Sequence, residues 1–234
     1  MVMELTAKAR RGCWDYNRCM VAPRFDYLDA LKLRSADDIL QESEAFFMKE
    51  GKVHATMKRL AQDLADEGIS YAIIGGMALN LWGYTRETVD VDILLTPDGL
   101  AAFKDRFVGR GYLLAFAGAS KAFRDTQTQV KIEVITTGEY PGDGKPKSVV
   151  FPNPAESSID RNGYRVIRLE KLIELKLASG LSAPHRMKDL ADVLELIIKL
   201  KLPLAFANNL DASVRAEYRR LWEGAQGAPP EPGE

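Results

Sequence analysis

The stretch IIGGMALNLWGYTRETVDVDILL, residues 73–95, decides how this chain folds. An apolar run meets two glycines, Gly75 and Gly76, and a segment with the composition of a helix follows them. A second run then alternates apolar residues with Asp90 and Asp92. Because successive side chains of a strand point to opposite faces, both aspartates lie on one face and the apolar residues on the other. The stretch predicts a strand, a glycine turn, a helix and a second strand.

The two aspartates need a partner of opposite charge. Carboxylates on the order of 4 Å apart repel each other by about 4 kcal/mol at an effective dielectric constant near 20. Glu133, in the alternating segment VKIEVIT, supplies a third carboxylate on the same side of the predicted sheet. A hard divalent cation, Mg²⁺ or alternatively Mn²⁺, compensates such a cluster. Two such ions roughly 3.5–4 Å apart would activate an acceptor oxygen and stabilise the leaving group of phosphoryl transfer.

The glycine pair suits the phosphate side of the same site. Gly75 and Gly76 let the backbone approach a ligand closely, and the N–H groups at the start of the following helix favour an anion. By itself a Gly-Gly turn is most often a tight connection, and an Asp-x-Asp pair can be a solvated strand face. Found together in this order, the two features are much more specific.

The rest of the chain adds helices and short strands around this unit. Apolar spacing predicts helices from about Ser35 to Phe47 and from Val53 to Gly68, and later helices near 98–110, in LEKLIELKLASG and RMKDLADVLELIIKL, and at 211–223. Further strands are expected in GYLLAF, KAFRD, VKIEVIT and YRVIRL. We therefore expect an α/β (α+β) fold, with a small mixed β-sheet flanked by helices, N-terminal helices and a C-terminal helical bundle. The expected divisions are a partly helical N-terminal extension (1–50), the core (51–155), a C-terminal helical region (156–224) and a disordered tail (225–234).

Composition limits the class of protein. Lys and Arg number 32 and Asp and Glu 33, so no basic field covers the whole protein. No run approaches the roughly 20 apolar residues of a membrane span, so no membrane partner is expected. Cys13 and Cys19 have neither a zinc-type spacing nor a disulfide framework around them, which favours a reducing, cytoplasmic location.

The succession IIGGMAL, Arg86, VDVDILL and VKIEVI resembles the nucleotidyltransferase superfamily that includes DNA polymerase β, and most of all its branch of AbiEii-type abortive-infection toxins. The resemblance covers about residues 53–200. It implies the nucleotidyltransferase fold, with Mg²⁺ chelated by the two aspartates and Glu133, and with the glycine turn on the nucleotide triphosphate. Two departures stand out: this chain has Gly-Gly where many members have Gly-Ser, and Glu133 as third carboxylate where Asp is common.

Three further features admit two interpretations each. Lys176 falls on an otherwise apolar helical stripe, so it either pairs with Asp189 or Asp192 or contacts the triphosphate while Asp189 orients it. Arg86 either reaches a phosphate or is an exposed loop arginine. The Gly/Pro-rich loop 138–147 is either a lid or a plain flexible connection.

The expected function is Mg²⁺-dependent transfer of a nucleoside monophosphate from an NTP to an acceptor hydroxyl. The acceptor is a tRNA or other RNA end, a protein or a small molecule, and the resemblance favours RNA and a toxin with an antitoxin partner. A basic set could serve a tRNA end: Arg165, Arg168, Lys171, Arg186 and Lys188. The alternatives are a catalytically inactive nucleotidyltransferase-fold binding protein or antitoxin-like component, and a metal-dependent hydrolase.

Overall fold

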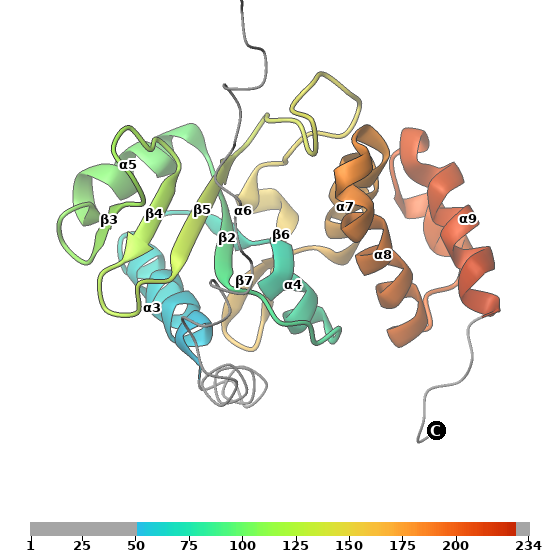
Figure 1. Ribbon diagram of the computed structural model, residues 1–234, viewed down its shortest axis with the longest axis horizontal. Helices are drawn as coiled ribbons and strands as arrows, with labels where there is room; N and C mark the ends of the chain where they lie inside the picture. Colours follow the sequence, from blue (N-terminus) through green and yellow to red (C-terminus); the bar gives the residue numbers. More distant parts are fainter. Residues whose placement is uncertain (1–50, 228–234) are drawn as a thin grey trace, which may run out of the picture. The chain divides into compact units, whose positions relative to one another are not determined.

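A computed structural model describes residues 51–227 of the chain. One mixed sheet forms its centre, with seven strands in the order β3-β4-β5-β2-β1-β7-β6 (Figure 1). In chain order, the strands are β1 (Tyr71–Ile73), β2 (Asp90–Leu95), β3 (Tyr112–Leu114), β4 (Ala122–Asp125), β5 (Lys131–Thr136), β6 (Ser158–Arg161) and β7 (Tyr164–Ile167). Two neighbouring pairs, β2 with β5 and β1 with β7, are parallel, and the others are antiparallel.

The pairing of β2 with β5 positions the charged residues. Asp92 lies opposite Glu133, and Asp90 lies opposite Lys131. Between the two aspartates, Val91 is fully buried. The alternation seen in the sequence therefore places the charged side chains of both strands on one face of the sheet, at its middle.

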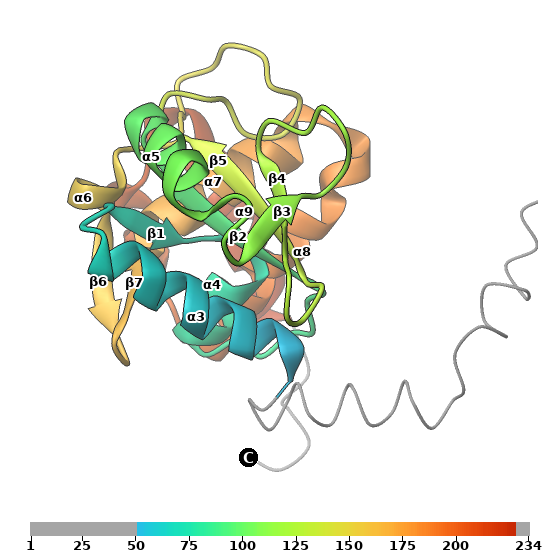
Figure 2. The same ribbon diagram turned by 90° about the vertical axis from the view of Figure 1, so that its left-hand side faces the viewer.

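Helices cover the sheet on both sides. The α-helices are α3 (Lys52–Asp66), α4 (Gly75–Trp82), α5 (Pro97–Phe107), α6 (Pro154–Ser157), α7 (Leu169–Ser182), α8 (Met187–Lys199) and α9 (Arg215–Gln226). Short 3₁₀ helices are η1 (Pro184–Arg186), η2 (Leu204–Asn209) and η3 (Ala212–Val214). Figure 2 shows α3 and α5 in front of the sheet and α7, α8 and α9 behind it.

The residues between β2 and α5 explain why the strand ends and the helix begins there. Thr96 ends the strand and is the N-cap of the helix, its side chain accepting a hydrogen bond from Gly99 N at 2.9 Å. Pro97 occupies the first turn, where no backbone N–H is required. Phe103 of this helix packs edge to face on Phe123 of β4 in the core. The aspartate strand is thus fixed from the side opposite its carboxylates.

The predicted fold class, a mixed sheet flanked by helices, is confirmed. One strand was not predicted, β6, because the sequence SIDR has a single large apolar residue and no alternation. Since β6 and β7 belong to the sheet, the sheet continues beyond residue 155, and the predicted division into a core and a C-terminal region stays a prediction. Helix α9 extends to Gln226, into the predicted tail. The predicted extension 1–50, with its helix at 35–47, and residues 228–234 lie outside the described part.

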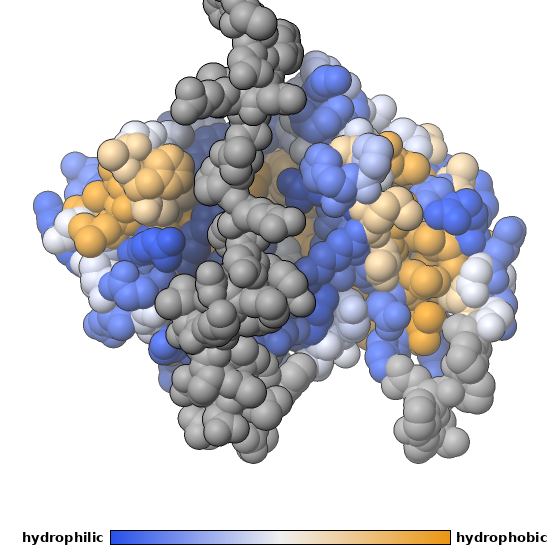
Figure 3. Space-filling view, in the orientation of Figure 1, coloured by the Kyte–Doolittle hydropathy of each residue, from blue (hydrophilic) through white to orange (hydrophobic). Residues whose placement is uncertain are grey.

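Apolar side chains are exposed near the sheet edge. Leu113 of β3 is 51% exposed and Phe116, just after it, is 64% exposed. Figure 3 shows apolar residues gathered at the left, where β3 lies in the same view of Figure 1. None of the helices within residues 51–227 combines the length and the apolar character that a bilayer crossing requires.

Candidate active site

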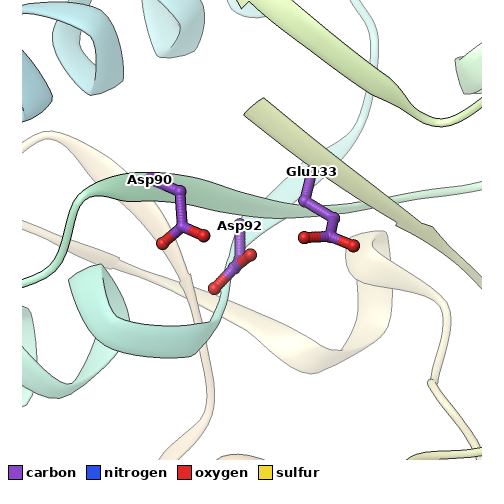
Figure 4. Close-up of side chains that lie close together, drawn as sticks. All are labelled: Asp90, Asp92 and Glu133. Carbon is purple, nitrogen blue, oxygen red and sulfur yellow. The ribbon is translucent and has the colours of Figure 1, made fainter. Parts of the chain in front are cut away.

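Three carboxylates from two adjacent strands form the centre of the site. Asp90 and Asp92 extend from β2 and Glu133 from β5, and Figure 4 shows their carboxylates on the same side of the strands. One oxygen from each residue lies within 4.8 Å of the other two. Asp90 also accepts a hydrogen bond from the Thr88 hydroxyl at 3.0 Å. The sequence predicted that these residues share a face, and the structure brings them together.

The pKa of Asp92 is strongly raised. Burial raises its pKa to about 7 from an ordinary value of 3.8, and the charges of Asp90 and Glu133 add to the rise. Lys176 and Lys131 act in the opposite direction. A bound cation would therefore favour the ionised form of this carboxylate.

Lys131 supplies one positive charge within the cluster. Its ammonium donates a hydrogen bond to Glu133 Oε2 at 2.8 Å, which raises the pKa of Lys131. Both side chains are partly exposed, 38% for Lys131 and 46% for Glu133. The alternation of VKIEVIT predicted the face on which Glu133 lies, but no role was predicted for Lys131.

The glycine turn lies directly against the aspartates. Gly75 begins α4 with a φ of +61°, in the left-handed region, and an ideal Cβ there would come 1.9 Å from Asp92 Oδ2. A Cβ on Gly76 would come 2.8 Å from the Thr88 side chain. Any side chain at either position would displace the side chain of Asp92 or of Thr88. The Gly-Gly pair is therefore required by close packing on Asp92 and Thr88.

The acids, the glycine turn and the C-terminal helices enclose one cleft of about 430 Å³. Among the residues predicted for the site, those lining it are Gly75, Gly76, Arg86, Asp92, Glu133, Lys176 and Asp189. Asp90 joins them through the carboxylate cluster. A larger cavity of about 540 Å³, lined by residues of α3, α4 and the β6–β7 turn, has no carboxylate in its lining.

A buried ion network forms part of the wall of this cleft. Lys176 of α7 donates to Asp189 Oδ1 at 3.0 Å and to Asp192 Oδ2 at 2.7 Å, both on α8. Ser179 donates to the second oxygen of Asp189 at 2.6 Å. The interpretation of Lys176 as an ion-pair partner therefore describes this structure, and its contact with a phosphate stays a prediction.

Arg86 is part of the same wall and is not an exposed loop residue. Its side chain is 20% exposed, and its Nε lies 3.3 Å from Asp192 Oδ1. The side chain of Asn80 in α4 holds the backbone of Arg86 by two hydrogen bonds: it accepts from Arg86 N at 2.8 Å and donates to Arg86 O at 2.9 Å. Asp192 and Asn80 thus hold residues predicted for the site, although the sequence analysis did not place either one in it.

The loop 138–147 borders the cleft with Glu139, Tyr140, Pro141 and Gly142. One hydrogen bond ties it to α7: Asp143 N donates to the Ser182 hydroxyl at 3.2 Å. An ideal Cβ on Gly142 would meet Ser182 Oγ at 1.9 Å, so this glycine is required by the close approach. The loop thus contacts α7 in this structure, and both interpretations, a lid and a plain flexible connection, stay predictions.

The predicted basic set is divided among different places. Arg186 and Lys188 line the cleft. Lys171 pairs with Glu174 at 2.7 Å beside a separate groove. Arg165 is engaged with Ser158 across the β6–β7 hairpin, at 2.8 Å. Arg168 is exposed at the N-cap of α7 and is not part of the cleft lining. Of the five, only Arg186 and Lys188 therefore line the cleft with the acids.

The donor set of the cluster suits a hard divalent cation. All three groups are carboxylates, the ligand type that Mg²⁺ and Mn²⁺ prefer. Asp92 forms no side-chain hydrogen bond with any other described residue, so its oxygens are available as ligands. Within residues 51–227 this is the one cluster of three or more potential metal ligands close enough to share an ion.

Comparisons with known proteins give structural neighbours only. No protein-family model matches the chain, and no curated protein matches it. The chain is similar to an antigenic nucleotidyltransferase-like protein from Paracoccidioides brasiliensis, with 19% identity over 62% of this chain and 75% of the other and a TM-score of 0.42. It is also similar to the antibiotic-resistance factor ANT(2″)-Ia in two structures. The solution structure is 14% identical, covering 73% and 94% of the two chains with a TM-score of 0.45. The complex with adenylyl-2″-tobramycin is 12% identical, covering 70% and 92% with a TM-score of 0.42. At these identities and TM-scores the likeness carries no activity over to this chain.

Proposed function

We propose that this protein transfers a nucleoside monophosphate from an NTP to an acceptor hydroxyl and releases pyrophosphate, in a reaction that depends on Mg²⁺ or Mn²⁺. The contact between the glycine turn and the acids carries the proposal: Gly75 begins α4 directly against Asp92, in the same cleft as Glu133. A helix N-terminus favours an anion and carboxylates favour a hard cation. Side by side, they suit a metal-bound triphosphate.

Each group has a role in this reaction. Asp90 and Asp92 hold the cation, which when bound supplies Lewis-acid stabilisation of the reacting phosphate. The N–H groups at Gly75 and Gly76 bind phosphate oxygens. Glu133 takes the proton of the acceptor hydroxyl while the acceptor oxygen forms a bond to the α-phosphorus. The bond from that phosphorus to the bridging oxygen breaks, and pyrophosphate leaves with the electron pair.

Two cations that line the cleft supply positive charge for the triphosphate. Arg86 and Lys176 line the same cleft as the glycine turn, and Asp189 orients Lys176 through its 3.0 Å hydrogen bond. Because these cations are partly buried, they lose little of their attraction to screening by salt. They bind the phosphates distal to the reacting one.

We propose an RNA 3′ end, such as that of tRNA, as the acceptor. Arg186 and Lys188 border the cleft, and Arg186 is half exposed, so both can contact a phosphate backbone. With such an acceptor the protein would act in the cytoplasm as the toxin of a toxin–antitoxin pair, restrained by an antitoxin partner.

Label transfer tests the proposal. The full chain is incubated with total cellular RNA, Mg²⁺ and each of the four NTPs labelled at the α-phosphate, and RNA, protein and small molecules are then separated. We expect label on RNA with the wild type and none with Asp90→Asn combined with Asp92→Asn. Equal labelling by both proteins would refute the catalytic assignment. Label on protein or metabolites alone would refute the RNA acceptor, and nucleotide binding without any transfer would indicate the inactive binding protein.

A further inference from the structure

Lys131 occupies one corner of a square of charged side chains on the sheet. The pairing of β2 with β5 sets Asp90 beside Lys131 and Asp92 beside Glu133. Along β5, Lys131 and Glu133 are two residues apart and share a face, and the ammonium donates to Glu133 Oε2 at 2.8 Å. The square thus holds three carboxylates and one lysine.

Stability does not explain the pair of Lys131 and Glu133. Both side chains are more than one-third exposed, and exposed ion pairs contribute little to the free energy of unfolding. The hydrogen bond also joins neighbours on one strand, so it ties no distant elements together. Its main physical effect is on the charge of the cluster: with all three carboxylates ionised, Lys131 changes the net charge from minus three to minus two.

We propose that Lys131 is a positioning residue that acts as a resident cation and limits the carboxylate cluster to one divalent cation. The inference rests on the proposed metal-dependent function and changes the two-ion site expected from the sequence. In the protein without nucleotide, a net charge of minus two is matched by one divalent ion. Lys131 holds Glu133 Oε2, so the other oxygen, Oε1, remains for the ion or for the acceptor proton.

A second lysine pair provides the matched control. Lys121 pairs with Glu139 and donates to the Thr136 hydroxyl at 2.9 Å. Both members of this pair are exposed to a similar degree, 37% and 39%, but neither belongs to the carboxylate cluster. Removing Lys121 changes the net charge of the protein as much as removing Lys131 does, without changing the charge of the cluster.

Manganese binding to the full chain tests the inference. Equilibrium dialysis with Mn²⁺ alone counts the bound ions, and electron paramagnetic resonance detects whether two of them are magnetically coupled, as ions roughly 3.5–4 Å apart are. We expect one ion for the wild type, Lys121→Met and Lys131→Arg. We expect two coupled ions for Lys131→Met, and none for Asp90→Asn combined with Asp92→Asn.

The outcomes separate this inference from the proposed function. Two ions in the wild type, or one ion in both the wild type and Lys131→Met, would overturn the role of Lys131 and leave the metal-dependent site intact. An additional ion in Lys121→Met would also overturn it, because net charge alone would then set the count. A wild type that binds no Mn²⁺ would overturn the proposed metal site and this inference with it.

Discussion

Gly75 and Asp92 are in such close contact that a methyl group at Gly75 would lie 1.9 Å from Asp92 Oδ2. The turn and the carboxylate therefore depend on each other's position. We expect Gly75→Ala to push Asp92 out of the cluster and lower the transfer rate by about 100-fold or more, because small misplacements of reacting groups have effects of this size. Label transfer and Mn²⁺ affinity measure the effect, and both should fall.

Gly68→Ala is the control for this substitution. Gly68 has nearly the same φ, +64°, but no atom lies within 4 Å of an ideal Cβ there. It should therefore lose about 1–2 kcal/mol of stability from the left-handed backbone alone and keep full activity. If Gly75→Ala lost only stability, as Gly68→Ala does, the turn would have no role in holding Asp92.

A second prediction follows from the raised pKa of Asp92. The folded protein keeps a proton on Asp92 up to a pH of about 7, whereas the unfolded chain loses it near 3.8. Between these values the folded state binds the extra proton, so the free energy of unfolding of the metal-free protein falls as the pH rises. Asp92→Asn should remove this loss and be more stable than the wild type above pH 7, by at most about 4 kcal/mol.

Urea unfolding in EDTA at pH 4 and at pH 8 measures this difference, with the exposed Asp105→Asn as the control. Near pH 4 both variants should have the same free energy of unfolding as the wild type. At pH 8 only Asp92→Asn should have a higher one. Mg²⁺ should raise the melting temperature of the wild type at pH 8 but not that of Asp92→Asn. A pH-independent gap between Asp92→Asn and the wild type would show that the carboxyl does not titrate as described.

A third prediction concerns the ion network on α7 and α8. Lys176→Met leaves Asp189 and the buried Asp192, whose side chain is 3% exposed, without their shared lysine. Breaking a buried pair in this way costs about 3–5 kcal/mol. Arg220→Met, which breaks a pair whose arginine is 62% exposed, should cost less than about 1 kcal/mol. Chemical denaturation compares the two, and equal losses would contradict a structural role for Lys176.

The centre of the site could be predicted because it depends on local alternation. The first and third residues of β2 are acidic, so the shared face of Asp90 and Asp92 follows from strand geometry alone. Glu133 follows in the same way once its segment is taken as a neighbouring strand. The mixed sheet follows from the order of apolar runs and glycines.

What could not be predicted depends on pairing and distance. The sequence does not specify which residue of β5 lies opposite Asp90, so Lys131 had no assigned place. Asp192 meets Arg86 across more than 100 positions of the chain, through the packing of α8 near the loop before β2. The requirement for glycine at Gly75 likewise reflects a contact with another strand. No periodicity encodes such contacts.

The last prediction concerns the acceptor and uses the two basic residues that border the cleft. If Arg186 and Lys188 contact RNA phosphates, each contact releases counterions, and the logarithm of affinity falls with the logarithm of salt concentration. Replacing both by Gln should reduce the magnitude of this slope by about 1.4 for a single-stranded end. It should also weaken transfer to all RNA sequences alike, because phosphate contacts carry no sequence information.

The control for this prediction neutralises Lys52 and Lys58, exposed lysines on α3, and should leave the slope unchanged. Equal slopes for the two double variants would exclude this rim as the RNA contact, and a flat dependence in the wild type would indicate an uncharged acceptor.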